Sequence, residues 1–220
     1  MVDAAPPRLT HAWAEMTKIL LTRHGHVEGI KPEQFRGRQD LALTARGRAE
    51  TEALARRIAA AWRPSKIYTS PLGRCIETGA AIAKACGIDA AVCGDLTDID
   101  YGRWQFKTFG DARREDPELF AAWFTTPHLI RFPDGEALQD VVARTANALR
   151  LALARHPDQT IVLVAHDGPN RALLLQLLDQ PLSAYWRTEQ DPCCINEIDI
   201  EGRDVRIARL NETRHLDGIA

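Results

Sequence analysis

Residues 18–25 have the sequence K-I-L-L-T-R-H-G, and this stretch decides the fold class. Lys18–Thr22 is a short apolar run of strand length, and an arginine, a histidine and a glycine follow it directly. An apolar run without polar alternation is typical of a strand that is buried on both faces. Two further segments have the same character, Lys66–Thr69 and Ile161–Ala165, and Ala90–Cys93 is a shorter candidate.

Helical patterns lie between and after these strands. In the first three of them apolar residues recur at spacings of three and four, which places them on one face of a helix, and the fourth is apolar nearly all round and is expected to be covered on both sides. The predicted helices are Ala45–Trp62, Leu72–Cys86, Leu138–Arg155 and Arg171–Leu178. Near the C-terminus, Cys194–Ile200 and Val205–Leu210 flank a polar turn and predict a hairpin.

Short apolar strands that alternate with helices predict an α/β fold. We expect three layers (αβα), with a mainly parallel sheet and helices on both faces. No internal repeat or linker-like composition divides the chain, so we expect a single domain over residues 16–220. Residues 1–15 are rich in Ala and Pro without periodicity, and we expect them to be a loosely ordered extension.

The composition excludes several functional classes. The 220 residues include 28 Lys and Arg and 30 Asp and Glu, so the formal net charge of −2 gives no reason to expect a nucleic-acid partner. No apolar stretch approaches the roughly 20 residues of a membrane span, and residues 1–18 lack a signal-peptide pattern, so we expect a cytoplasmic protein without a membrane partner. The five cysteines form no C-x-x-C pair and are interpreted as packing residues, with a vicinal disulfide at Cys193–Cys194 as the alternative.

Polar side chains follow three of the predicted strands. Because the carboxyl ends of parallel strands meet at one edge of a sheet, we expect these side chains to share one rim. The four that carry chemistry are Arg23, His24, Arg74 and His166. Arginine offers a planar fork of donors that matches phosphate oxygens, and histidine can act as a nucleophile, an acid, a base or a metal ligand.

The chain resembles the histidine phosphatase superfamily, which includes cofactor-dependent phosphoglycerate mutases and α-ribazole phosphatases. Six blocks carry the resemblance in order, covering residues 18 to about 175. They are R-H-G at 23–25, G-x-x-D-x-x-L-T-x-x-G at 37–47, Y-T-S-P-L-x-R-x-x-x-T at 68–78, L-x-D-I-x-Y-G-x-W at 96–104, P-x-G-E at 133–136 and V-A-H-D-G at 164–168. The resemblance implies a phosphoglycerate mutase-like fold.

The resemblance also implies a mechanism. His24 would attack phosphorus and form a phosphohistidine, while Arg23, Arg74 and His166 would hold the phosphoryl oxygens. Asp98 would protonate the leaving oxygen and later take a proton from water. The expected enzyme is a metal-independent phosphomonoesterase that needs no cofactor.

Further residues are expected to border the substrate, a small phosphorylated metabolite. Besides Arg23 and Arg74, they are Gly25, Arg36, Gly37, Tyr101, Asp167 and Gly168. Arg36 either binds a second anionic group of the substrate or is an ordinary surface charge. The sequence is compatible with a homodimer.

Several alternatives remain open at this point. Asp98 stands where the family usually has Glu, and Asp100, which would face the same side of a strand, is the rival acid. His24 and His26 form an H-x-H pattern that also suits two zinc ligands, which would make the protein a metallohydrolase. Cys75 is either a reactive thiol or, as we favour, a packing residue.

Two alternatives concern larger features of the chain. The aromatic-rich segment 106–132 either packs on the domain or, as we favour, forms a flap over the phosphate site. The whole protein is either a phosphatase, as we favour, a phosphoglycerate mutase, or a relative that binds a phosphorylated ligand without catalysis.

Overall fold

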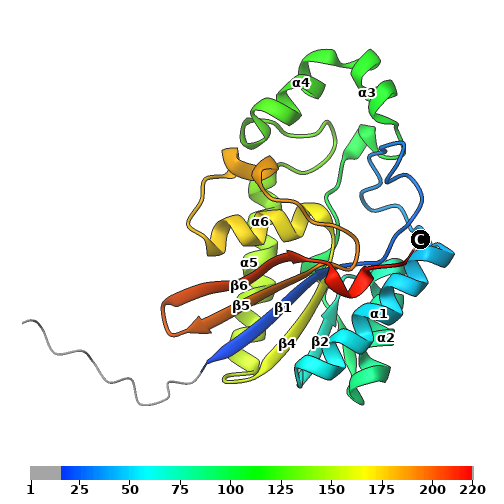
Figure 1. The fold of residues 1–220 in the computed structure, drawn as a ribbon. Coiled ribbons are helices and arrows are strands. Elements are labelled where there is room, and N and C mark those ends of the chain that lie inside the picture. The colour runs from blue at the N-terminus through cyan, green and yellow to red at the C-terminus, as the bar shows by residue number, and fades with distance from the viewer. Residues whose placement is uncertain (1–15, 220) are drawn as a thin grey trace, which may run out of the picture.

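A computed structural model describes residues 16–219 and contains one six-stranded mixed sheet (Figure 1). The strand order is β3-β2-β4-β1-β5-β6, and the expected extension at residues 1–15 lies outside the described residues. The strands are β1 (Thr17–Arg23), β2 (Lys66–Thr69), β3 (Ala90–Val92), β4 (Thr160–Ala165), β5 (Ile195–Glu201) and β6 (Asp204–Glu212). The first four are parallel to one another and the C-terminal hairpin is antiparallel, which confirms the predicted mainly parallel sheet.

Four of the helices correspond to the expected segments, and two lie in the segment 106–132. They are α1 (Ala45–Ala61), α2 (Gly73–Cys86), α3 (Phe109–Glu115), α4 (Pro117–Thr125), α5 (Leu138–Arg155) and α6 (Asp167–Leu177). Short 3₁₀ segments lie at Gly94–Leu96, Gly102–Trp104, Pro127–Leu129, Leu182–Arg187 and Arg214–Leu216. No helix among residues 16–219 is both long enough and apolar enough to cross a membrane.

Helix α6 begins earlier than the predicted start at residue 171. Gly168 and Pro169 usually interrupt helices, but here they lie in the first turn. The N–H groups of a first helical turn have no intrahelical acceptor, so a proline there removes no hydrogen bond. The earlier start matters for the site, because it places Asp167 and Gly168 on the helix that directly follows β4.

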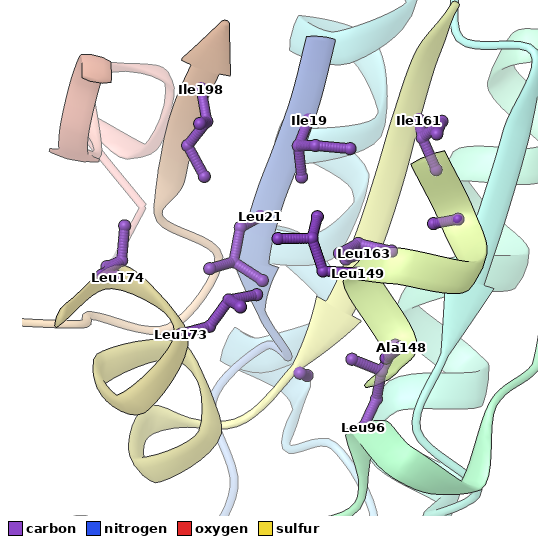
Figure 2. Packing of buried hydrophobic residues seen from close by; sticks show 12 residues of the cluster. Ile19, Leu21, Leu96, Ala148, Leu149, Ile161, Leu163, Leu173, Leu174 and Ile198 are labelled. Atoms are coloured by element: carbon purple, nitrogen blue, oxygen red, sulfur yellow. The ribbon is translucent and has the colours of Figure 1, made fainter. Parts of the chain in front are cut away.

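Helices cover both faces of the sheet, as expected. On one face, Leu20 and Val162 of the sheet pack against Leu54 of α1 and Ile82 of α2. On the other face, the intervening strand residues pack against α5 and α6; the labelled side chains include Leu21 of β1 and Leu173 of α6 (Figure 2). Successive strand residues point to opposite faces, so a continuous apolar strand fills two cores at once.

Leu20 provides a test of this arrangement, because its side chain is fully buried between the sheet and α1. Leu20→Ala should lower the free energy of unfolding by about 2–5 kcal/mol, through lost burial and the cavity left behind. The measurement is denaturant unfolding. Leu129→Ala, at a leucine that is 74% exposed, is the control and should change stability by less than about 0.5 kcal/mol. Equal effects from both variants would contradict this description of the core.

The segment 106–132 forms a small helical unit that stands away from the sheet (Figure 1). Thr108 caps α3 in a capping box with Asp111, and Asp116 caps α4 ahead of Pro117. Trp123 of α4 is buried, and its backbone oxygen accepts a hydrogen bond of 2.8 Å from the indole N–H of Trp186. Trp123 therefore packs on the body of the domain, whereas Phe106 and Leu129 of the same segment are exposed.

Candidate active site

The carboxyl ends of β1 and β4 and the start of α2 bring together the four side chains that the sequence places on one rim. The rings of His24 and His166 lie 5.1 Å apart, centroid to centroid, with their planes at 62°. The Nε–H of Arg74 donates a 3.1 Å hydrogen bond to Nε2 of His24. All of these side chains, with Arg23, are buried. Strand pairing explains the assembly, since Arg23 at the end of β1 lies beside the last residue of β4.

His24 is held in one tautomer. Its Nδ1 lies 2.7 Å from the carbonyl oxygen of Gly25, and a carbonyl can only accept, so Nδ1 carries the proton. Nε2 therefore has a free lone pair, which accepts from Arg74. Burial, followed by the positive charge of Arg74, holds the pKa of His24 well below its usual range. The result is a neutral imidazole whose basic nitrogen faces a guanidinium.

Gly25 packs against α1, and its expected contact with the substrate stays a prediction. Its backbone N–H donates to Thr78, and a Cβ atom there would collide with the backbone oxygen of Gly47 in α1. It is not among the residues that line the cavity beside His24. Gly25 therefore lets β1 and α1 approach closely, which in turn positions His24.

Arg74 is anchored by backbone oxygens. Its guanidinium donates to the carbonyl groups of Gln39 and Gly37, and to Oδ2 of Asp98 at 3.1 Å. Because these acceptors are supplied by the folded chain, the guanidinium is held in position before any ligand binds. Such preorganised charge is the main way in which enzymes stabilise phosphoryl transfer.

Asp98 lies in the site and Asp100 does not. Oδ2 of Asp98 is 3.6 Å from Nδ1 of His166 as well as 3.1 Å from Arg74. Asp100 pairs with Arg38 and accepts from the backbone N–H of Gly102. The expectation that both carboxylates face the same side of a strand is wrong, because residues 97–101 form no strand and the two-residue alternation does not apply.

His166 is fixed by two residues of the β2–α2 region. Its Nε2 lies 2.7 Å from Oγ of Ser70 and 3.4 Å from Sγ of Cys75. Burial, followed by the charges of Arg74 and Arg23, lowers the pKa of His166. Burial also raises the pKa of the Cys75 thiol, so this cysteine packs beneath the histidine as a neutral group. The sequence analysis did not single out Ser70; its position directly after a strand was the signal that could have found it.

Arg23 has a buried donor without a partner in the described part of the chain. Its Nη1 donates to the backbone oxygen of Gln190 at 2.6 Å, while its Nε is buried without a partner among residues 16–219. A buried guanidinium N–H that lacks an acceptor is costly, and an anionic ligand would relieve that cost.

A cavity opens beside His24, and most of the expected substrate-binding residues line it. Gly25 and Arg74 are the two expected residues that are not among the lining residues, which are Arg23, His24, Gln34, Arg36, Gly37, Asp98, Tyr101, Asp167 and Gly168. Gln34 was not expected, and no motif marks it. No residue of the segment 106–132 lines the cavity in the described chain, so the flap over the phosphate site stays a prediction.

The alternative metal site has little geometric support. The ring Nδ1 of His26 lies 3.0 Å from Oγ1 of Thr44, which also caps α1. Within the described residues, no group of three or more His, Cys, Asp or Glu side chains could hold a metal ion. The five cysteines, including Cys193 and Cys194, are free thiols in the structure.

The family model of the histidine phosphatase superfamily (branch 1) matches residues 19–213. The chain belongs to this superfamily. Phosphoserine phosphatase 1 of Hydrogenobacter thermophilus is 32% identical over 91% of this chain and 95% of its own length. A probable phosphoglycerate mutase, GpmB of Cronobacter sakazakii, is 30% identical over 84% of this chain and 86% of its own length.

Solved structures of the superfamily share the fold. YhfR of Bacillus stearothermophilus superposes with a TM-score of 0.87 and 29% identity, covering 91% of this chain and 100% of that one. Membership of the histidine phosphatase superfamily confirms the resemblance that the six sequence blocks carry. Each of those blocks begins and ends inside the match.

Proposed function

We propose that the protein hydrolyses a small phosphomonoester, without a metal ion, through a phosphohistidine intermediate on His24. The observation that carries the proposal is the Nε2 lone pair of His24, which the Gly25 carbonyl keeps unprotonated beside the buried guanidinium of Arg74. Attack on phosphorus requires such a lone pair, and the charge that builds on the phosphoryl oxygens requires cationic donors around it.

In the first step, Nε2 of His24 attacks phosphorus and the bond from phosphorus to the ester oxygen breaks. Arg23, Arg74 and His166 hold the three non-bridging oxygens. Asp98, which takes up a proton from solvent when the phosphoryl group engages Arg74 in its place, gives that proton to the ester oxygen, and the alcohol leaves. Substrate binding must replace the hydrogen bond from Arg74 to His24 by one to a phosphoryl oxygen, which frees the lone pair for attack.

In the second step, water attacks phosphorus and the bond from phosphorus to His24 breaks. Asp98, now a carboxylate, takes a proton from the water. Inorganic phosphate leaves, and both His24 and Asp98 return to their starting protonation states. The two guanidinium groups and His166 do the work for which many other phosphoryl-transfer enzymes use Mg²⁺.

A phosphoglycerate mutase is the second candidate, and the similarity to a probable mutase of Cronobacter sakazakii favours it. The first step would be the same, but the other hydroxyl of the bound glycerate would then accept the phosphoryl group from His24 in place of water, which returns a phosphoglycerate phosphorylated at the other position. We favour hydrolysis because the relative with the highest identity quoted above is named a phosphatase, and its chain aligns over nearly its whole length.

The proposal predicts activity that does not depend on metal ions. With an aryl phosphate as substrate, the steady-state rate in excess chelator should equal the rate without it, because the charge-stabilising groups are side chains. The measurement is phosphate release after dialysis against chelator, with and without added Mg²⁺ or Zn²⁺. Activity that disappears in chelator and returns with Zn²⁺ would favour the metallohydrolase alternative and contradict the proposal.

A further inference from the structure

Two charged side chains line the cavity but take no part in the steps described above. They are Arg36, from the loop that follows β1, and Asp167, the first residue of α6. A cavity that serves only the phosphoryl group would need cations, so a carboxylate at its wall requires another explanation.

Arg36 is a largely buried cation with spare donors. Its guanidinium donates to the carbonyl of Gly29, while its Nε is buried without a partner among the described residues. Burial, followed by repulsion from Arg23, lowers the pKa of Arg36 to about 10. An anion at this point of the cavity would both satisfy the free donor and offset the repulsion.

Asp167 has one committed oxygen and one spare oxygen. Its Oδ1 accepts a 2.7 Å hydrogen bond from Nε of Arg171, and within residues 16–219 no hydrogen bond reaches its Oδ2. The guanidinium of Arg171 is itself held over the ring of Trp186, at 5.2 Å from the centroid. Asp167 is thus fixed in place and 31% exposed at the cavity wall, with an acceptor available for a cationic ligand.

Tyr101 connects these charges to the general-acid position. Its ring lines the same cavity and its hydroxyl is buried. Burial, followed by the charges of Asp98 and Asp167, raises the pKa of Tyr101, while Arg36 opposes the effect. Arg36, Asp98 and Asp167 line the same cavity as the phenol, so one small ligand beside His24 can meet a cation, the general-acid position and a second carboxylate.

We propose that Arg36 and Asp167 select a zwitterionic leaving group, with its carboxylate on Arg36 and its ammonium on Asp167. The substrate class is an O-phosphorylated β-hydroxy amino acid. In such a molecule both charged groups are attached to the carbon next to the one that carries the ester oxygen, so both lie within reach when that oxygen meets Asp98. The inference rests on the proposed function for its phosphoryl step and adds the identity of the alcohol.

The test compares three esters that differ in one charged group at a time. Phosphoserine carries both groups, phosphoethanolamine lacks the carboxylate, and 3-phosphoglycerate has a hydroxyl in place of the ammonium. For the wild type, kcat/KM for phosphoserine should exceed that for each of the others by roughly 10- to 100-fold, the range of one charge-assisted hydrogen bond. The measurement is release of inorganic phosphate.

Each variant should remove one preference. Arg36→Gln should abolish the preference for phosphoserine over phosphoethanolamine, and Asp167→Asn the preference over 3-phosphoglycerate. Arg56→Gln on α1 and Asp204→Asn in the hairpin are matched controls, because both residues are exposed and distant in sequence from the two residues under test. The two ratios of kcat/KM, for phosphoserine over each of the other esters, should be unchanged in these variants. Similar rates on all three esters in the wild type would overturn the inference. So would an Arg36→Gln variant that loses the same factor on every ester, because that pattern belongs to a phosphate contact.

A binding measurement separates this inference from the hydrolytic mechanism. Calorimetric titration of His24→Ala with phosphoserine should show affinity that falls roughly 10-fold or more when Arg36→Gln or Asp167→Asn is added. Selective binding without phosphate release by the wild type would contradict the proposed hydrolysis and leave the subsite intact. If the wild type releases phosphate but does not discriminate between the esters, in rate or in binding, the subsite is contradicted and the proposed hydrolysis is left intact.

Discussion

His24→Ala should lower kcat for an aryl phosphate by at least roughly 10⁴-fold, the scale of loss seen when a covalent nucleophile is removed. The physical reason is that the remaining side chains can hold the phosphoryl group but no lone pair is left to attack it. The measurement is steady-state phosphate release, together with rapid quenching into alkali, where a phosphohistidine is stable. The wild type should yield a labelled protein from a substrate labelled in its phosphoryl group, and the variant should yield none.

His26→Ala is the matched control for this experiment, because it removes the same residue type two positions further along. Its ring contacts Thr44 and does not line the cavity, so its activity should stay within about threefold of the wild type. If both variants lost activity equally, the H-x-H pair would be acting as one unit and the metal alternative would be favoured. Labelled protein from His24→Ala would remove His24 from the role of nucleophile.

Asp98→Asn should lower kcat/KM for an alkyl phosphate by roughly 10²- to 10⁴-fold, the contribution typical of a positioned proton donor. An alkoxide is a poor leaving group and needs that proton, whereas nitrophenolate leaves without it. The loss with a nitrophenyl phosphate should therefore be much smaller. This dependence on the leaving group separates proton donation from the loss of the ion pair between Asp98 and Arg74, which would affect both substrates alike.

Asp100→Asn is the control for Asp98. Asp100 is engaged by Arg38 and by the backbone of Gly102, outside the cavity, so we expect a change of less than about threefold on either substrate. A large loss in Asp100→Asn combined with an active Asp98→Asn would reverse the assignment. It would also mean that segment 97–101 rearranges when substrate binds.

Much of the fold could be predicted from local pattern. The strand Lys18–Thr22 and the helix Leu138–Arg155 were found within one or two residues of their observed ends, because burial on both faces and an apolar stripe each leave a periodic trace in the sequence. The shared rim of Arg23 and His166 could be predicted as well, since parallel strands end at one edge. The start of α6 was misplaced because Gly168 and Pro169 resemble a loop when their neighbours are unknown.

The sequence by itself determined which residue types reach the carboxyl edge of the sheet, and the six ordered blocks determined the family. Only the tertiary structure decided how those residues act. The tautomer of His24 depends on where the carbonyl of Gly25 points, and the position of Arg74 depends on carbonyl groups 35 and 37 residues away. The choice between Asp98 and Asp100 depends on a segment that forms no strand. The Arg74 contacts join parts of the chain that are distant in sequence, and the other two outcomes depend on backbone directions that the packing of the whole domain sets, so no local pattern encodes them.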